Sequence, residues 1–266
     1  YGSRALEDPA YADAARSAAR FVLDRLQRQG RLLHRYRDGD AHIEAFLDDY
    51  AFFTWGLLEL YEATGEPLWL AEAARLSRQM LADFWDPEGG GFFLSGRRNE
   101  SLIAKTKELY DGALPSGNSV AALTLTRLAL LTGDQEFETS AARLFRAFAG
   151  QVEGAPHAFP QLLIALDLWL GPSREIVLAG DPRDTALQQM RQAVHRRFLP
   201  RTMVLLHPAS GPAAREIEAL APFVVAQRPL APPMAGLEGR ATAYVCEGRV
   251  CQLPTTDLQQ LETLLK

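Results

Sequence analysis

The stretch WLAEAARL, from Trp69 to Leu76, recurs as FETSAARL from Phe137 to Leu144, 68 positions farther along the chain. A shorter copy, YADAAR from Tyr11 to Arg16, matches the segment from Leu70 to Arg75 at an offset of 59 positions. Repeats of this length are units of two helices, and neighbouring units stack because no unit buries its apolar face alone. The sequence therefore predicts stacked helix pairs.

The two helices of a unit differ in where their apolar residues lie. From Asp49 to Thr64 these residues cover most of the helix circumference, which is typical of an inner helix buried on nearly all sides. From Pro67 to Phe84 they form a single stripe, which indicates an outer helix. Thr64-Gly65 and Thr132-Gly133 carry the signal that ends each inner helix.

This alternation predicts the order of the helices. We expect outer helices at about 9–29, 67–84 and 135–151, and inner helices at about 48–64, 116–132 and 157–170. Inner helices separated by an outer helix must run parallel. Gly-flanked apolar stretches at 31–40 and 89–96 indicate short β excursions over one rim. Because a closed toroid of six pairs needs about twice this helical length, the chain is either an arc or part of a longer protein.

The pattern changes after Gly171-Pro172. The run EIVLA at 175–179, an amphipathic helix at 184–198 and the run TMVLL at 202–206 together predict a βαβ unit. Segments 242–246 and 250–253 flank Glu247-Gly248 as a hairpin, and 256–265 is expected as a terminal helix capped by Thr255 or Thr256. Gly180-Asp181-Pro182 lacks the spacing of a dinucleotide-binding loop, so a plain turn is favoured there. We therefore expect helix repeats over 1–171 and a small α/β subdomain over 172–266.

Composition excludes several classes of function. Twenty-eight Lys and Arg against thirty-three Asp and Glu, without a basic run, argue against a nucleic-acid partner. No apolar stretch approaches the roughly 18 residues of a membrane span, and the start at Tyr1 has neither a signal core nor an initiating Met. We expect a processed or truncated, cytoplasmic protein without cofactor, metal or membrane partner.

The only two cysteines, Cys246 and Cys251, suit a reducing compartment. If Glu247-Gly248 is a two-residue turn, Cys246 lies opposite Arg249 and Cys251 opposite Tyr244. The thiols would then be diagonal neighbours with Cα atoms about 7 to 8 Å apart, beyond the usual reach of a disulfide. We therefore expect free thiols, although a four-residue loop would pair the two cysteines directly.

Three runs carry a family resemblance. They are FLDDYAF at 46–52, KELYDGALPSGNS at 107–119, and AYVC at 243–246 with Cys251. With them the chain resembles the C-terminal part of the spermatogenesis-associated, thioredoxin-domain family. The resemblance implies a mostly α fold, part of an (α/α)6 toroid similar to N-acylglucosamine 2-epimerases and six-hairpin glycosidases. It also implies as a partner the absent N-terminal thioredoxin-like domain, or another chain that completes the toroid.

The candidate functional residues gather at one rim of the helix array. The 68-residue offset superposes Asp48 on Ser116 and Tyr50 on Asn118, so both pairs lie where inner helices begin, and His157 opens the next one. Parallel inner helices bring their N-termini together, where free N–H groups favour an anionic or hydroxyl-rich ligand. The candidate catalytic residues are Asp49, Asp111 and His157, and the candidate substrate-binding residues are Asp48, Tyr50, Trp55, Lys107, Ser116, Asn118 and Ser119.

Each of these residues also has a structural interpretation. Asp48 or Asp49, and Ser116, Asn118 and Ser119, suit helix caps, and Asp111 suits a turn with Gly112. A cap needs only one acid, so the second of Asp48 and Asp49 must have another partner. Two functions therefore stay open. The rim binds a sugar-like molecule in a carbohydrate-active enzyme, either an epimerase or isomerase with His157 as base or a glycosidase-like enzyme with Asp49 and Asp111 as acid and base. Alternatively, the array is a scaffold for a peptide or partner domain. Because the predicted toroid is incomplete, we also expect its N-terminal edge to be apolar and covered by another chain or by missing residues.

Overall fold

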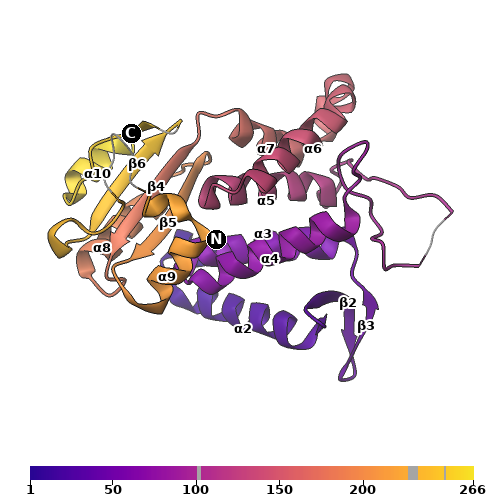
Figure 1. Ribbon diagram of the computed structural model, residues 1–266, viewed down its shortest axis with the longest axis horizontal. Helices are drawn as coiled ribbons and strands as arrows, with labels where there is room; N and C mark the ends of the chain where they lie inside the picture. Colours follow the sequence, from indigo (N-terminus) through magenta and orange to yellow (C-terminus); the bar gives the residue numbers. More distant parts are fainter. Residues whose placement is uncertain (101–102, 227–232, 249) are drawn as a thin grey trace.

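The computed structural model describes residues 1–266 except 101–102, 227–232 and 249. Helices and turns of the N-terminal part are α1 Gly2–Leu6, α2 Pro9–Arg25, α3 Leu47–Thr64, α4 Pro67–Phe84, α5 Gly117–Thr132, α6 Gln135–Gly154, η1 Pro156–Ala158 and α7 Pro160–Leu170. A small sheet of β1 Gln27–Arg28, β2 Arg31–Arg37 and β3 Asp40–Glu44 follows α2. Figure 1 shows these helices lying side by side next to the C-terminal sheet.

The alternation of inner and outer helices is confirmed. Helix α4 has the predicted bounds, and α3 and α5 each begin within one residue of the expected start. Both inner helices end on a left-handed glycine, Gly65 and Gly133, each with φ of 72°. Glycine adopts this conformation without steric cost, which is why the Thr-Gly signal marks the ends of these helices.

The inner helices run parallel, as the repeats predicted. Gly117 at the start of α5 packs on Asp48 at the start of α3, and Arg127 near the end of α5 pairs with Glu59 and Glu62 in the last turns of α3. The starts of α5 and α7 share Asp111, which accepts hydrogen bonds from both. The three N-termini therefore lie at the same end of the array.

Several element bounds differ from the sequence predictions. Helix α2 ends at Arg25 because β1 begins two residues later and pairs with β2. The last inner helix begins at Pro160, whose ring suits the first helical position, and His157 lies before it in the 3-10 turn η1. Segment 89–96 forms only an isolated bridge, between Trp85 and Phe92. The excursion predicted at 31–40 contains β2, and its hairpin partner β3 was not predicted.

The C-terminal part contains the predicted βαβ unit. It comprises β4 Arg174–Gly180, α8 Thr185–His195, β5 Thr202–Pro208, α9 Gly211–Leu220, η2 Pro222–Val224, η3 Leu237–Gly239, β6 Thr242–Glu247, β7 Val250–Cys251 and α10 Leu258–Leu264. The strand order is β5-β4-β6-β7, with β5 parallel and β6 antiparallel to β4. Helix α9 was not predicted, and the cap of α10 is Asp257 in place of Thr255 or Thr256.

One apolar core joins the helices to the sheet. Val177 on β4 and Tyr244 on β6 belong to the same buried cluster as the inner helices, whereas Ile176 and Leu178 face a second cluster with α8 and α10. Successive strand residues point to opposite faces, so the sheet lies between two layers of helices. The Tyr61 hydroxyl of α3 accepts a hydrogen bond from the Leu206 amide of β5 at 3.2 Å, which fixes the position of the sheet.

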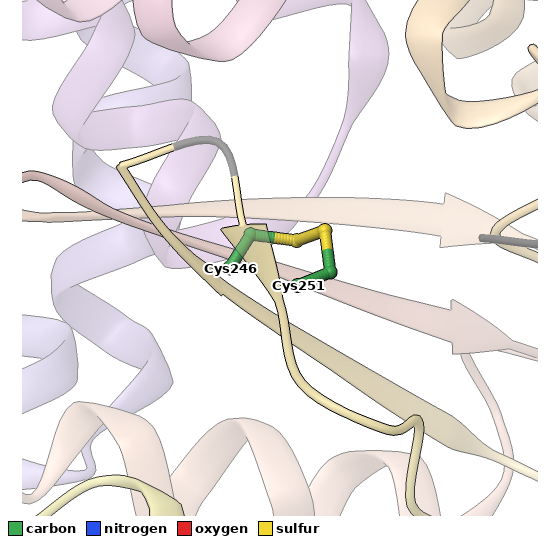
Figure 2. Close-up of a disulfide and its surroundings, with 2 residues drawn as sticks. All are labelled: Cys246 and Cys251. Carbon is green, nitrogen blue, oxygen red and sulfur yellow. A yellow bond between two sulfur atoms is a disulfide. The ribbon is translucent and has the colours of Figure 1, made fainter. Parts of the chain in front are cut away.

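The prediction of free cysteines is wrong. Cys246 and Cys251 form a disulfide, drawn in Figure 2, with their Cα atoms 3.8 Å apart. Strand β6 continues through Glu247, which pairs with Val250, so the turn starts one residue later than expected and the cysteines come directly opposite. Arg249, which was predicted to lie opposite Cys246, is outside the described residues. Successive side chains of a strand point to opposite faces. A shift of the turn by one residue therefore decides whether the two cysteines are diagonal neighbours or lie directly opposite each other.

No helix among the described residues combines the length and hydropathy that a membrane crossing requires.

His195 at the end of α8 makes stability depend on pH. Burial, with the nearby charges of Arg4 and Arg191, lowers the pKa of His195 from 6.5 to about 3. Below pH 6.5, His195 becomes protonated in the unfolded chain but stays neutral in the folded protein. The free energy of unfolding therefore decreases as the pH falls. We expect a loss of at most about 1.4 kcal/mol per pH unit between pH 6 and 5.

Urea unfolding at these two pH values measures this loss. We expect His195→Leu to weaken the pH dependence of the free energy of unfolding. The control His157→Gln, at an exposed position, should leave that pH dependence unchanged. An equal slope in wild type and His195→Leu would contradict the assignment.

Candidate functional site

Asp111 joins the N-termini of two inner helices. Its Oδ1 accepts a hydrogen bond from the Ser116 amide at 2.9 Å, and its Oδ2 accepts from the amides of Gln161 and Leu162 at 2.9 and 3.2 Å. These amides have no acceptor within their own helices, because the first N–H groups of a helix lack one. The carboxylate, 8% exposed, therefore supplies an acceptor to both α5 and α7.

The SGNS segment at 116–119 also supplies side chains that bond backbone groups at the rim. Ser116 is the N-cap of α5, and its hydroxyl accepts from the Ser119 amide at 3.1 Å. The Asn118 side chain accepts from the Phe92 amide at 2.8 Å and donates to the carbonyls of Phe92 and Glu108 at 2.9 and 2.8 Å. Asn118 thus ties two loops of the rim to the helix.

Asp49 and Tyr50 also bond the backbone. Asp49 Oδ2 accepts from the Phe46 amide at 2.8 Å, which completes a capping arrangement, and lies 2.8 Å from Nδ1 of His34 on β2. The hydroxyl of Tyr50, which is buried, accepts from the Leu32 amide at 3.1 Å. The structure therefore directs Asp49 toward β2, whereas Asp111 lies between α5 and α7.

The remaining predicted residues make other contacts. Lys107 donates to Asp86 Oδ2 at 2.5 Å and to the Gly90 carbonyl at 2.6 Å. The hydrogen bond from Lys107 lowers the pKa of Asp86 to about 2. Trp55 is half-buried beside Phe52, at 6.4 Å between ring centroids, and His157 is exposed in η1. The Asp111 amide donates to the carbonyl of Ala158, next to His157, at 3.0 Å, so the turn that carries His157 lies at the same rim as Asp111.

Asp48 is the rim carboxylate with the most perturbed environment. Burial raises its pKa, and the charges of Glu108 and Asp49 raise it further, against a hydrogen bond from the Gly117 amide. Glu108 is exposed and was not among the predicted site residues. The sequence signal for it was its place beside Asp111 in the KELYD run. Burial and a nearby like charge both disfavour the charged form of a carboxyl group, which is why the pKa of Asp48 is raised.

Gly117 is required where the two helices meet. A Cβ built on it would lie 2.2 Å from Asp48 Oδ1 and 2.9 Å from Leu47 Cγ. Alanine favours helices over glycine, yet we expect Gly117→Ala to lower the free energy of unfolding by about 1 to 3 kcal/mol through overpacking.

The matched control is Gly150→Ala in α6, where a new Cβ would meet nothing within 4 Å. It should raise stability by about 0.5 to 1 kcal/mol. Thermal unfolding of both variants checks the pair, and a stabilising Gly117→Ala would contradict the close helix contact.

Among the residues that the structure describes, no three His, Cys, Asp or Glu side chains gather in a way that could hold a metal ion.

Comparison with known proteins gives relatives but no matching family model. Spermatogenesis-associated protein 20 of Homo sapiens is 37% identical over 221 residues, which are 83% of this chain and 27% of that protein. The Mus musculus protein of the same name is 36% identical, with the same coverage. An uncharacterized protein of Caenorhabditis elegans is 29% identical over 98% of this chain and 35% of its own length. The chain thus spans about a quarter to a third of the length of the curated relatives it matches.

Proposed function

We propose that this chain, whose relatives carry the name spermatogenesis-associated protein 20, is a helix-pair scaffold that binds a further helical segment on the outward face of α7. The occupant corresponds to a segment of the longer relatives outside the matched residues. Once bound, this segment continues the row of helix pairs toward a ring. In this proposal the rim motif sets the geometry of the array.

The observation that carries the proposal is the composition of α7. Its sequence PQLLIALDLWL is as apolar as that of a fully buried inner helix, yet Ile164 is 57% and Leu170 74% exposed. In α5, by contrast, every residue from Gly117 to Leu128 is buried. The exposed side of α7 carries Ile164 and Leu170 with Asp167 between them in the sequence, and Asp167 pairs with Arg201. Apolar residues left uncovered on an inner helix are typical of a stack that continues, because each helix pair buries its face on the next one.

The length of the relatives supports a helical occupant. About three quarters of the human protein lies outside the matched segment. The opposite edge, helix α2, exposes Tyr11 and Phe21 by 52% and 46% among charged residues, and its cover stays a prediction. We assign the occupant to α7 because that face is the more apolar of the two.

Co-purification tests the scaffold. The chain is co-expressed with the tagged part of the human relative that lies outside the matched residues, and we expect it to be retained. Ile164→Glu combined with Leu170→Glu should abolish retention, because two buried charges would face an apolar surface. Phe198→Glu, at a site 91% exposed elsewhere, is the control and should retain binding. Retention of the double variant, or capture by a thioredoxin-like domain alone, would contradict this face.

A second candidate function is binding of a sugar-like molecule at the rim, in an epimerase-like or glycosidase-like enzyme. The specific observation in its favour is Asp48, whose pKa is raised by burial and by the charge of Glu108, as a general acid requires. Tyr110, 69% exposed beside Asp111, offers a ring for stacking. This candidate assigns the chemistry to Asp48 and Glu108 in place of Asp49, which bonds the Phe46 amide and His34, and Asp111, which accepts from three amides.

A thermal-shift screen of monosaccharides and oligosaccharides tests this second candidate. A sugar that stabilises the wild type should lose its effect in Asp48→Asn and in Glu108→Gln, and keep it in Asp134→Asn at the start of α6. A thermal shift that persists in both Asp48→Asn and Glu108→Gln would exclude sugar binding at Asp48.

A further inference from the structure

The disulfide lies at the exposed edge of the C-terminal sheet. Strand β7, which carries Cys251, is the last strand and pairs only with β6 among the described strands. Cys246 is 5% exposed and packs in the core shared with the helices, whereas Cys251 is half-buried. Val250 and Leu253, on either side of Cys251, are 69% and 83% exposed. Cys251 packs against the same core but is the more exposed of the two cysteines, so we take its sulfur as the one that a second molecule attacks.

The surrounding hairpin is held together independently of this bond. The Gln252 amide donates to the Val245 carbonyl at 2.9 Å, and Ala243 and Thr255 exchange two hydrogen bonds of 2.8 and 3.0 Å. The disulfide links residues only five positions apart, and a short loop loses little entropy on closure. Its contribution to folding is small for a disulfide, so a purely stabilising role explains it poorly.

The bond also forms part of a cavity wall. Cys246 and Gly248 line a cavity of about 550 Å³ between the C-terminal ends of α5 and α7 and the sheet. Trp169, Phe223 and Val177 line the same cavity. Figure 2 shows the sulfur bridge crossing directly between the two strands, so a change at either sulfur acts on the strand that bears Cys246.

We propose that Cys246 and Cys251 are a reversible redox pair that a dithiol reduces under native conditions, and that their state alters the cavity wall. A thiolate of the dithiol attacks Sγ of Cys251 and forms a mixed disulfide, while the bond to Cys246 breaks and Cys246 leaves as a thiolate. The second thiol of the reductant, as a thiolate, then attacks its own sulfur in the mixed disulfide and releases Cys251. The reductant becomes a disulfide with loss of two electrons, and its two protons pass to the protein thiolates.

Reduction of the folded protein by dithiothreitol tests the proposal. We expect thiol labelling to rise from none to two per chain without denaturant, and to reverse on addition of oxidised dithiothreitol. Circular dichroism should be retained, with the melting temperature lowered by no more than about 8 °C. Trp169 emission should change with the redox state. That change should disappear in Trp169→Phe and in Cys251→Ser, and persist in Trp85→Phe, which alters a tryptophan outside the cavity.

Three results would overturn the proposal. Thiols that are labelled only after a denaturant is added would make the bond structural. Two thiols that are labelled without any reductant would mean that the bond does not form. Loss of the folded state on reduction would mean that the hairpin depends on the bond.

Discussion

Replacing Arg127 with alanine is expected to lower the free energy of unfolding by about 3 to 5 kcal/mol, because it leaves two largely buried carboxylates with one guanidinium in place of two. Arg127 is 4% exposed and donates to Glu59 Oε1 at 2.5 Å and to Glu62 Oε1 at 2.7 Å. Arg4 of α1 binds the same two carboxylates and only partly replaces the lost charge.

The pKa directions agree with a tightly paired cluster. Burial alone would raise the pKa of Glu59, but the charges of Arg127 and Arg4 outweigh it and lower the pKa. Burial alone would likewise lower the pKa of Arg127, but Glu62 and Glu59 raise it. Because the folded pKa of Glu59 is lowered, its contribution to stability is present above the unfolded pKa and is lost as the pH falls through the folded value.

Equilibrium urea unfolding at pH 7 measures the effect of Arg127→Ala. Arg78→Ala is the control, since Arg78 pairs with Asp134 while its own side chain is 50% exposed, and such pairs contribute about 0 to 1 kcal/mol. Similar losses for both variants would contradict a buried network between α3 and α5.

Replacing Asp111 with asparagine is expected to cost about 2 to 4 kcal/mol. An asparagine has a single carbonyl oxygen, so it cannot accept from all three amides that the carboxylate bonds, and its NH2 group would face an N–H. Hydrogen bonds to a charged acceptor contribute about 1.5 to 3 kcal/mol, and helix caps about 0.5 to 2 kcal/mol.

The same substitution at Asp134 is the matched control. Asp134 caps α6 through the Glu136 amide at 2.8 Å, and asparagine is an equally good N-cap, so Asp134→Asn should change stability by less than about 1 kcal/mol. Unfolding curves of the two variants decide the question. An Asp111→Asn protein of unchanged stability would instead favour the catalytic role that the sequence had suggested.

Much of the helical architecture could be predicted because it is encoded in local patterns. The repeat at 68 residues gave the bounds of α4, the Thr-Gly ends of α3 and α5, and their parallel direction. The same offset relates Glu59 to Arg127, which pair across the two helices. That ion pair was readable from the sequence but was missed, since both residues look like ordinary charged positions on a helix.

Other features depended on contacts that no local pattern specifies. The hairpin register turned on whether Glu247 belongs to the turn or the strand, and one residue decided between free thiols and a disulfide. At the rim, the sequence gathered the right cap residues but could not show that Asp111 faces two helices while Asp49 faces His34. Direction of a side chain within a cluster follows from packing, which the residue type alone does not determine.

The carboxylate of Asp111 is the acceptor that holds the starts of α5 and α7 together, and amide hydrogen exchange tests this most directly. In Asp111→Ala, the amides of Ser116, Gln161 and Leu162 should all lose protection, because each loses its acceptor. The Gly133 amide, bonded to Ala129 at the other end of α5, should keep its protection. Unchanged protection of the three amides in this variant would contradict the shared cap, and with it the way this sequence aligns its inner helices.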